Sequence, residues 1–206
     1  MKKVILASSS PRRIEILSWL GIPFDVAVPN VDELAIRDED AVKLCRKLAK
    51  TKAQVISKSY KDGLIIGTDT IVKLGKLIIE KPINKKDQRR LIKLQNGKIM
   101  EIISGVYVVD ASTGKSMIRT KKTKFKMKKI SDKLINFYIK SGQGVDKGGG
   151  FGIQDENGMF VENITGCYTN AIGFPICTVA KILENFGVPI KQNIKILVKE
   201  KTGYSC

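Results

Sequence analysis

The stretch Val4-Ile5-Leu6-Ala7-Ser8-Ser9-Ser10-Pro11-Arg12-Arg13 joins a short apolar run to three serines, a proline and two arginines. The apolar run predicts a buried strand. Ser10 and Pro11 predict the N-cap and the first residue of a helix, because a hydroxyl suits the cap and proline suits the first helical turn. A strand that leads directly into a helix is typical of an α/β fold.

Outward from this stretch, strand and helix patterns alternate along the chain. Apolar runs predict strands near residues 24–28, 64–72, 77–79, 101–111 and 117–127, and helical spacing predicts helices near 40–60, 84–95, 131–140 and 175–186. The last two strands are separated by a short polar turn, which indicates a hairpin. Strands that alternate with helices, together with a hairpin, predict an α/β fold with a mixed sheet.

The composition narrows the chemistry that the chain can perform. Its 206 residues include no histidine. This absence excludes Ser-His-Asp and Cys-His catalysis as well as zinc sites built on histidine. Acid and base catalysis would therefore depend on carboxylates and lysines.

The charge raises the question of a nucleic-acid partner. The chain carries 37 basic and 20 acidic residues, a net charge of +17. Only seven of the basic residues are arginines, although arginine is the better ligand for phosphates and base edges. Aromatic residues make up 6% of the chain, so stacking surfaces are scarce. A lysine-biased composition is the favoured explanation, and a nucleic-acid partner is the less favoured one.

The cysteines and the apolar runs indicate the cellular compartment in which the chain is expected. The four cysteines lie far apart in sequence and form no CxxC pair; they are Cys45, Cys167, Cys177 and Cys206. We expect a reducing cytoplasm. No apolar run reaches the roughly 20 residues that a membrane helix needs, so no membrane association is expected.

Two segments carry side chains suited to an anionic ligand and to catalysis. Residues 8–13 place hydroxyls, free helix N–H groups and two guanidiniums together, which suits a phosphate. The alternative is an ordinary helix cap with two surface arginines. Gly67-Thr68-Asp69-Thr70 places one carboxylate at the end of an apolar run, where it would serve a cation or a reaction. The alternative is a turn-stabilising aspartate.

A third segment, residues 146–154, is rich in glycine and ends in Gln154. Glycines let the backbone approach a ligand closely, and the amide of Gln154 can both donate to and accept from a base edge. The alternative is a flexible loop. Considered singly, Lys52, Lys81 and Glu33 are weaker candidates, because such residues are usually solvated on the surface.

Several motifs agree in order and spacing with those of one known family, over nearly the whole chain from Val4 to about Phe186. They are Leu6-Ala7-Ser8-Ser9-Ser10-Pro11-Arg12-Arg13, Val31-Asp32-Glu33, Gly67-Thr68-Asp69-Thr70, Glu80-Lys81-Pro82, Asp146-Lys147 with residues 149–154, and Gly166-Cys167-Tyr168 through Gly173-Phe174-Pro175. With these motifs the chain closely resembles the Maf family of nucleoside triphosphate pyrophosphatases. The resemblance implies a single domain over residues 1–206, with a two-lobed fold like that of the inosine triphosphatases and a central nucleotide-binding cleft.

The resemblance also implies roles for individual residues. Asp69 would be the catalytic proton acceptor, and Glu33 with Asp69 would hold a divalent metal cation, Mg²⁺ or Mn²⁺. The residues expected to bind the substrate are Ser8, Arg12, Arg13, Glu33, Lys52, Thr70, Lys81 and Gln154. Arg12, Thr70 and Gln154 match the specificity positions of the subgroup that prefers dTTP and UTP, whereas a second subgroup acts on 7-methyl-GTP.

The function implied is hydrolysis of dTTP, UTP or modified pyrimidine nucleotides to the monophosphate and pyrophosphate, by a cytoplasmic homodimer. The alternative is a non-catalytic nucleic-acid-binding or cell-division regulatory protein. The chain departs from the family at four positions, where Met100 replaces a usual histidine, Ser104 a threonine, Gly148 an alanine and Phe151 a tyrosine.

Overall fold

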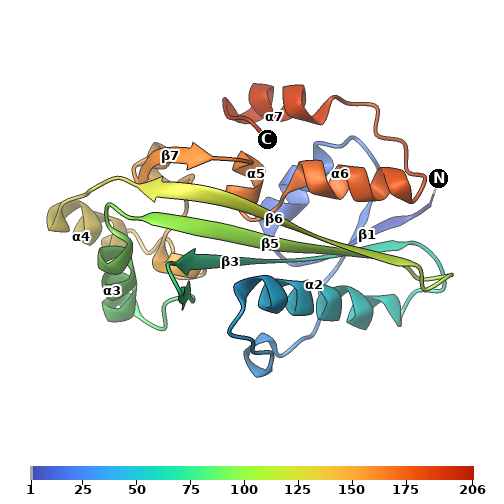
Figure 1. Ribbon diagram of the computed structural model, residues 1–206, viewed down its shortest axis with the longest axis horizontal. Helices are drawn as coiled ribbons and strands as arrows, with labels where there is room; N and C mark the ends of the chain where they lie inside the picture. Colours follow the sequence, from blue (N-terminus) through green and yellow to red (C-terminus); the bar gives the residue numbers. More distant parts are fainter. Residues whose placement is uncertain (1) are drawn as a thin grey trace.

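The computed structural model describes residues 2–206, and a seven-stranded sheet forms its centre (Figure 1). The strands are β1 (Val4–Ala7), β2 (Asp25–Ala27), β3 (Leu64–Leu74), β4 (Leu77–Ile79), β5 (Ile99–Asp110), β6 (Ser116–Met127) and β7 (Val161–Thr165). Their order is β2-β1-β3-β5-β6-β7, with β4 paired to β3. β1 runs parallel to β2 and β3, and the other pairs are antiparallel. The predicted α/β fold with a mixed sheet is confirmed.

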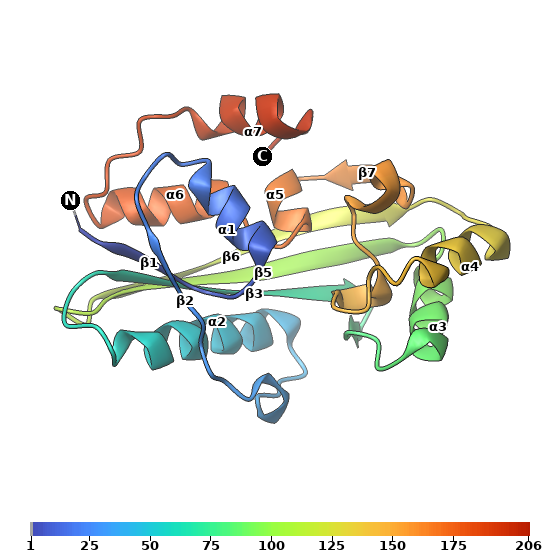
Figure 2. The ribbon, with the colours of Figure 1, turned by 180° about the vertical axis from the view of Figure 1, so that it is seen from behind.

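Helices cover both faces of this sheet. They are α1 (Pro11–Ser18), α2 (Ala41–Ser57), α3 (Lys85–Gln95), α4 (Asp132–Lys140), α5 (Tyr168–Ala171), α6 (Ile176–Asn185) and α7 (Ile194–Thr202), with short 3₁₀ turns η1 (Glu33–Ala35), η2 (Gly148–Gly150) and η3 (Asp155–Gly158). α2 lies alone against one face, and α1, α5, α6 and α7 lie on the other (Figures 1 and 2). α3 and α4 pack together at one end of the sheet.

The strand pleat divides the core between the two faces. Ile5 and Ile65 pack with Ala49 and Ala53 of α2. The alternate strand residues, such as Leu6, join the larger core beneath α1 and α6. Strands buried on both faces read as continuous apolar runs, which is why the sequence identified β1 and β3 readily.

Four of the seven α-helices in residues 2–206 begin with a side-chain cap, whereas α1, α5 and α6 do not. Asn84 accepts the N–H of Asp87 at 2.9 Å, and Ser131 accepts the N–H of Leu134 at 3.3 Å. Ser10 stands at the N-cap of α1 as predicted, but its hydroxyl makes no capping hydrogen bond. The first turn of α1 therefore keeps N–H groups that no group in residues 2–206 accepts from.

Three elements have no counterpart among the predicted ones: β7, α5 and α7. β7 and α5 have five and four residues, too few to show a period.

The fold also gathers three of the four cysteines that the sequence separates. Cys177 and Cys206 form a disulfide, and the Sγ atom of Cys167 lies 2.8 Å from that of Cys206. Among residues 2–206, no helix has the length and apolar character needed to cross a membrane.

Candidate active site

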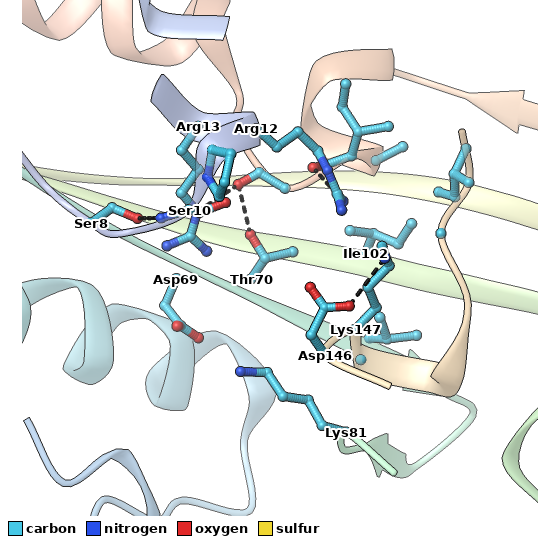
Figure 3. A pocket seen from close by; sticks show the side chains of 18 of the residues that line it. Ser8, Ser10, Arg12, Arg13, Asp69, Thr70, Lys81, Ile102, Asp146 and Lys147 are labelled. Carbon is cyan, nitrogen blue, oxygen red and sulfur yellow. Dashed lines mark hydrogen bonds and ion pairs between the residues drawn. The ribbon is translucent and has the colours of Figure 1, made fainter. Parts of the chain in front are cut away.

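A cavity of about 480 Å³ is lined by residues of α1, η1, α2 and β3 and by the loops 146–153 and 171–173 (Figure 3). Because β1 and β3 are parallel, with Ala7 paired to Gly67, the residues that follow this pair emerge at the same edge. All but one of the predicted site residues line the cavity. They are Ser8, Arg12, Arg13, Glu33, Lys52, Asp69, Thr70 and Lys81. The exception is Gln154.

Two glycines allow α2 to lie unusually close to the sheet. A Cβ atom at Gly67 would lie 2.1 Å from the carbonyl oxygen of Ala49, and one at Gly105 would lie 2.5 Å from another carbonyl oxygen of α2. Gly105 is the β5 partner of Asp69. Lys52 follows Ala49 by one turn and Asp69 follows Gly67 by two residues, so the close packing brings the ammonium and the carboxylate together.

Lys52 bridges two carboxylates at the edge of the cavity. Its Nζ donates to Oδ1 of Asp69 at 2.6 Å and lies 2.9 Å from Oε1 of Glu33. The Lys52 and Asp69 side chains are 6% and 10% exposed, so their charges interact in a site that water screens weakly. Burial raises the pKa of Glu33, but the Lys52 ammonium outweighs this effect and holds that pKa below its ordinary value.

The loop after α5 anchors both arginines of α1. Arg13 donates through Nη1 to the Thr68 carbonyl at 2.9 Å and through Nε to the Gly173 carbonyl at 3.2 Å. Arg12 donates to the Ile172 carbonyl at 3.3 Å. Burial lowers the pKa of Arg13, and the charges of Asp69 and Glu33 oppose this effect. Figure 3 shows the Arg13 guanidinium extending toward Asp69.

Thr70 and Ser8 add hydroxyl groups on the same side of the cavity. Thr70 Oγ1 lies 2.8 Å from Oγ of Ser104, its β5 partner, and donates to the Gly173 carbonyl at 3.2 Å. Ser8 Oγ accepts the N–H of Ser10 at 3.2 Å. The segment therefore presents hydroxyls, helix N–H groups and guanidiniums together, an arrangement that suits an anion.

The opposite side of the cavity carries further charge. Lys81 is exposed, and Figure 3 shows its ammonium extending toward Asp69 from below. Lys147 pairs with Asp146 at 3.0 Å. Burial raises the pKa of Asp146, but the hydrogen bond and charge of Lys147 outweigh it, so that pKa lies below its ordinary value.

Gln154 lies apart from the cavity lining. Its side chain is exposed and lies near the hydroxyl of Tyr168 on α5. Burial raises the pKa of Tyr168, and the contact with Gln154 opposes the rise. The structure thus places Gln154 at the rim, one residue after the lining residue Ile153.

Two glutamines that the sequence reading missed order the glycine-rich loop. Gln88 donates through Nε2 to the Gly150 carbonyl at 2.8 Å, and Gln95 donates through Nε2 to the Gly149 carbonyl at 2.7 Å. Both are fully buried on α3. Gly149 and Gly150 have φ values of 86° and 80°, which other residues rarely adopt. These contacts favour an ordered turn at residues 149–150 over the flexible-loop alternative.

A second missed feature is the apolar part of the cavity. It is formed by Val72, Met100, Ile102, Phe125, Phe151 and Ile153. Met100, which stands where the resembled family has a histidine, is buried among these residues. A pocket with a charged end and an apolar end suits a ligand with an anionic group and a flat, weakly polar group.

The fold and this cavity define a class of α/β protein in which cationic side chains and a buried carboxylate line one pocket, an arrangement that suits a polyanionic ligand. Comparisons agree with this class. A family model for Maf-like proteins matches residues 3–186, and the chain belongs to that family. The Maf resemblance found in the sequence motifs is thereby confirmed.

Named relatives cover almost the whole chain. A dTTP/UTP pyrophosphatase of Alkaliphilus metalliredigens is 43% identical over 186 residues, which is 89% of this chain and 96% of the relative. Another of Desulforamulus reducens is 38% identical and covers 92% of this chain and 100% of the relative. The solved structure of a HAM1 protein from Coxiella burnetii covers 90% of this chain and 100% of its own, with a TM-score of 0.51 at 11% identity. This last likeness concerns the fold alone.

Proposed function

We propose that the chain is a nucleoside triphosphate pyrophosphatase that hydrolyses dTTP and UTP to the monophosphate and pyrophosphate. The observation that carries the proposal is the convergence of Asp69, Lys52 and Arg13 on one cavity, in a chain similar to proteins named dTTP/UTP pyrophosphatases. The cavity volume of about 480 Å³ falls within the range of small-molecule sites. Modified pyrimidine nucleotides are further candidate substrates.

Some residues of the cavity bind the substrate, and others take part in proton transfer. Arg12, Arg13 and Lys81 bind the triphosphate, together with Ser8 and the free N–H groups of α1, and stabilise the charge that develops as the α-β bond breaks. Asp69 accepts the proton of the water that attacks the α-phosphorus, a role that a carboxylate can fill where no histidine exists. Lys52 holds Asp69 and Glu33 in place.

Glu33 and Asp69 provide ligands for a divalent cation only if the phosphates of the substrate provide the others. Residues 2–206 contain no cluster of three or more acidic, cysteine or histidine side chains that could hold a metal alone. Asp69 and Glu33 each use one oxygen on Lys52, and no group in residues 2–206 hydrogen-bonds to the other oxygen. Mg²⁺ commonly binds one or two carboxylates plus phosphates. Glu33 and Asp69 would hold it, and the bound cation would neutralise charge on the phosphates.

Pyrophosphate release from a panel of canonical and modified nucleoside triphosphates, with and without Mg²⁺ or Mn²⁺, tests the proposal. We expect Asp69→Asn to keep the fold and nucleotide binding and to lose turnover roughly 100-fold or more, the scale of lost acid or base catalysis. Asp62→Asn, which changes an exposed aspartate away from the cavity, serves as the matched control. Full turnover in Asp69→Asn would remove the proposed base.

Three further expectations remain part of the proposal: a homodimer, a cytoplasmic location and the absence of an obligatory nucleic-acid partner. Sedimentation at varied protein concentration tests the first. The non-catalytic alternative is not favoured, because the relatives that cover the chain carry the names of enzymes. Duplex binding that is sensitive to salt and survives substitution of Asp69 and Lys81 would support that alternative.

A further inference from the structure

Three sulfur atoms meet where the last residues of the chain return to the fold. Cys206 is bonded to Cys177 in the first turn of α6, and its Sγ lies 2.8 Å from Sγ of Cys167, the N-cap of α5. The fourth cysteine, Cys45, is buried elsewhere, and burial raises its pKa to about 12. A thiol with such a pKa stays protonated and inert near neutral pH.

The arrangement suits thiol-disulfide exchange. Attack of the Cys167 thiolate on Sγ of Cys206 would form the Cys167–Cys206 bond and release Cys177 as a thiolate, with no net oxidation. A dithiol reductant would instead supply two electrons and two protons, give two cysteine thiols, and itself become a disulfide. A cavity of about 350 Å³ reaches Cys206 and is lined by Lys195 and Lys199, so a reagent can approach the bond.

The residues before Cys206 pack directly on α5. The ring of Tyr204 stacks on that of Tyr168, with centroids 4.4 Å apart and planes 4° from parallel. The carbonyl of Ser205 accepts the N–H of Tyr168 at 3.0 Å. Tyr168 in turn contacts Gln154 at the rim of the active-site cavity. We call residues 203–206 the tail; they lie beyond the 3–186 segment that matches the Maf family model.

The tail thereby fastens both ends of the loop that orients the cationic side chains. α5 and α6 flank residues 172–175, whose carbonyls accept hydrogen bonds from Arg12, Arg13 and Thr70. Cys206 is bonded to α6 on one side of the loop, and the tail contacts α5 on the other. Loss of the disulfide would remove the covalent link to α6 and leave the tail held to α5 by one stacking contact and one main-chain hydrogen bond, besides the hydrogen bond from Lys199 to the Gly203 carbonyl.

We propose that Cys167, Cys177 and Cys206 form a thiol-disulfide exchange site whose bond to the tail clamps the loop between α5 and α6 and so strengthens nucleotide binding. The effect on binding rests on the proposed function. In a reducing compartment such a bond forms transiently, so the site would report oxidising conditions. Cys206 acts here as a positioning residue, through the loop, and touches no reacting atom.

The test compares protein oxidised with diamide and protein reduced with dithiothreitol. Thiol counting after unfolding should find two free cysteines in the first and four in the second. We expect reduction to raise KM for dTTP about 5-fold or more, with a smaller change in kcat, a typical size for coupling between sites. Cys206→Ser should show the raised KM of the dithiothreitol-treated protein in both conditions. Ser205→Ala should respond like the parent protein.

Hydrogen exchange at the Tyr168 amide provides a readout that needs no activity, because this amide donates to the tail. Its protection should fall on reduction and in Cys206→Ser. Failure of the disulfide to form, equal KM values in both states, or a dithiothreitol response that persists in Cys206→Ser would overturn the proposal. If no nucleotide is hydrolysed in any state, the proposed function fails, and the exchange measurement alone decides whether the tail is a redox clamp.

Discussion

At the residue scale, Lys52 interacts with two carboxylates at once, and its removal would leave them facing each other. We expect Lys52→Met to destabilise the protein by roughly 3 kcal/mol, because a buried pair loses one partner. The variant also lets the pKa of Glu33 rise, since Lys52 is the group that lowers it. Activity that needs this carboxylate charged is present above its pKa, so the acid limb of kcat/KM should move to higher pH.

A pH profile of kcat/KM measures this effect. Lys47→Met is the matched control, because Lys47 lies on the exposed side of α2 and pairs with Asp38. An acid limb that stays in place in Lys52→Met would contradict the assignment of Glu33 and Lys52 to the site.

Gln154 offers the sharpest test of base preference. We expect Gln154→Glu to reduce kcat/KM for dTTP and UTP roughly 10-fold relative to a purine triphosphate, because a carboxylate cannot donate to a base carbonyl. Thermal unfolding should change little, since the side chain is exposed. An unchanged nucleotide profile would count against base recognition at this position.

Sequence reasoning found the charged residues of the site better than it found their partners. Asp69 and Arg13 lie within dense local motifs, but Lys52 resembles any surface lysine until α2 is placed on β3. The sequence position of Gln88 and Gln95 could have identified them, because they share the buried face of α3 with Leu91 and Ile92. A glutamine on an apolar stripe needs a buried partner.

At the scale of elements, the contact between α2 and the sheet is the most sensitive one. We expect Gly67→Ala to cost about 3 kcal/mol of stability, because the new methyl group would overlap the Ala49 carbonyl and force α2 outward. The same shift separates Lys52 from Asp69, so turnover should fall as well. Denaturant unfolding and pyrophosphate release measure the two effects.

Gly75→Ala is the control for this substitution. Its Cβ atom would meet nothing within 4 Å, and its φ of +59° adds only a backbone penalty of about 1–2 kcal/mol. Turnover should therefore be kept. If Gly67→Ala retains both stability and turnover, α2 is not held by this contact.

Elements were predictable where they were long or clearly capped. β3, β5, β6 and α2 have 11 to 17 residues each and show their period plainly. Within residues 2–206, β7 pairs with β6 and no other strand, and α7 packs on α6 through few apolar residues. Both elements therefore depend on tertiary contacts, which a local sequence pattern does not show. The cysteine cluster was hidden for the same reason.

At the scale of the whole molecule, Lys2 and Asp110 connect the beginning of the chain to the far end of β5. Lys2 donates to Oδ2 of Asp110 at 2.5 Å, and Ser112 donates to Oδ1 through its N–H at 3.0 Å and its hydroxyl at 2.7 Å. The Lys2 and Ser112 hydrogen bonds hold the pKa of Asp110 well below its ordinary value. The folded protein therefore binds this proton less readily than the unfolded chain.

The stabilisation from Asp110 is consequently complete above the unfolded pKa of about 4 and is lost as the pH falls toward the folded value. We expect Asp110→Asn to lower the free energy of unfolding by roughly 1–3 kcal/mol at neutral pH and to flatten the acid side of the stability curve. Denaturant unfolding at several pH values measures this. If the free energy of unfolding falls equally steeply with decreasing pH in parent and variant, other carboxylates govern acid unfolding.

The closeness of α2 to β3 and β5 has an evolutionary consequence. The spacing between Lys52 and Asp69 is fixed by two missing methyl groups, and it does not depend on which aliphatic side chains fill the surrounding core. Core residues can drift in size and shape while the charges keep their separation. Selection for catalysis should then act strongly on Gly67 and Gly105, two positions that carry no functional group at all.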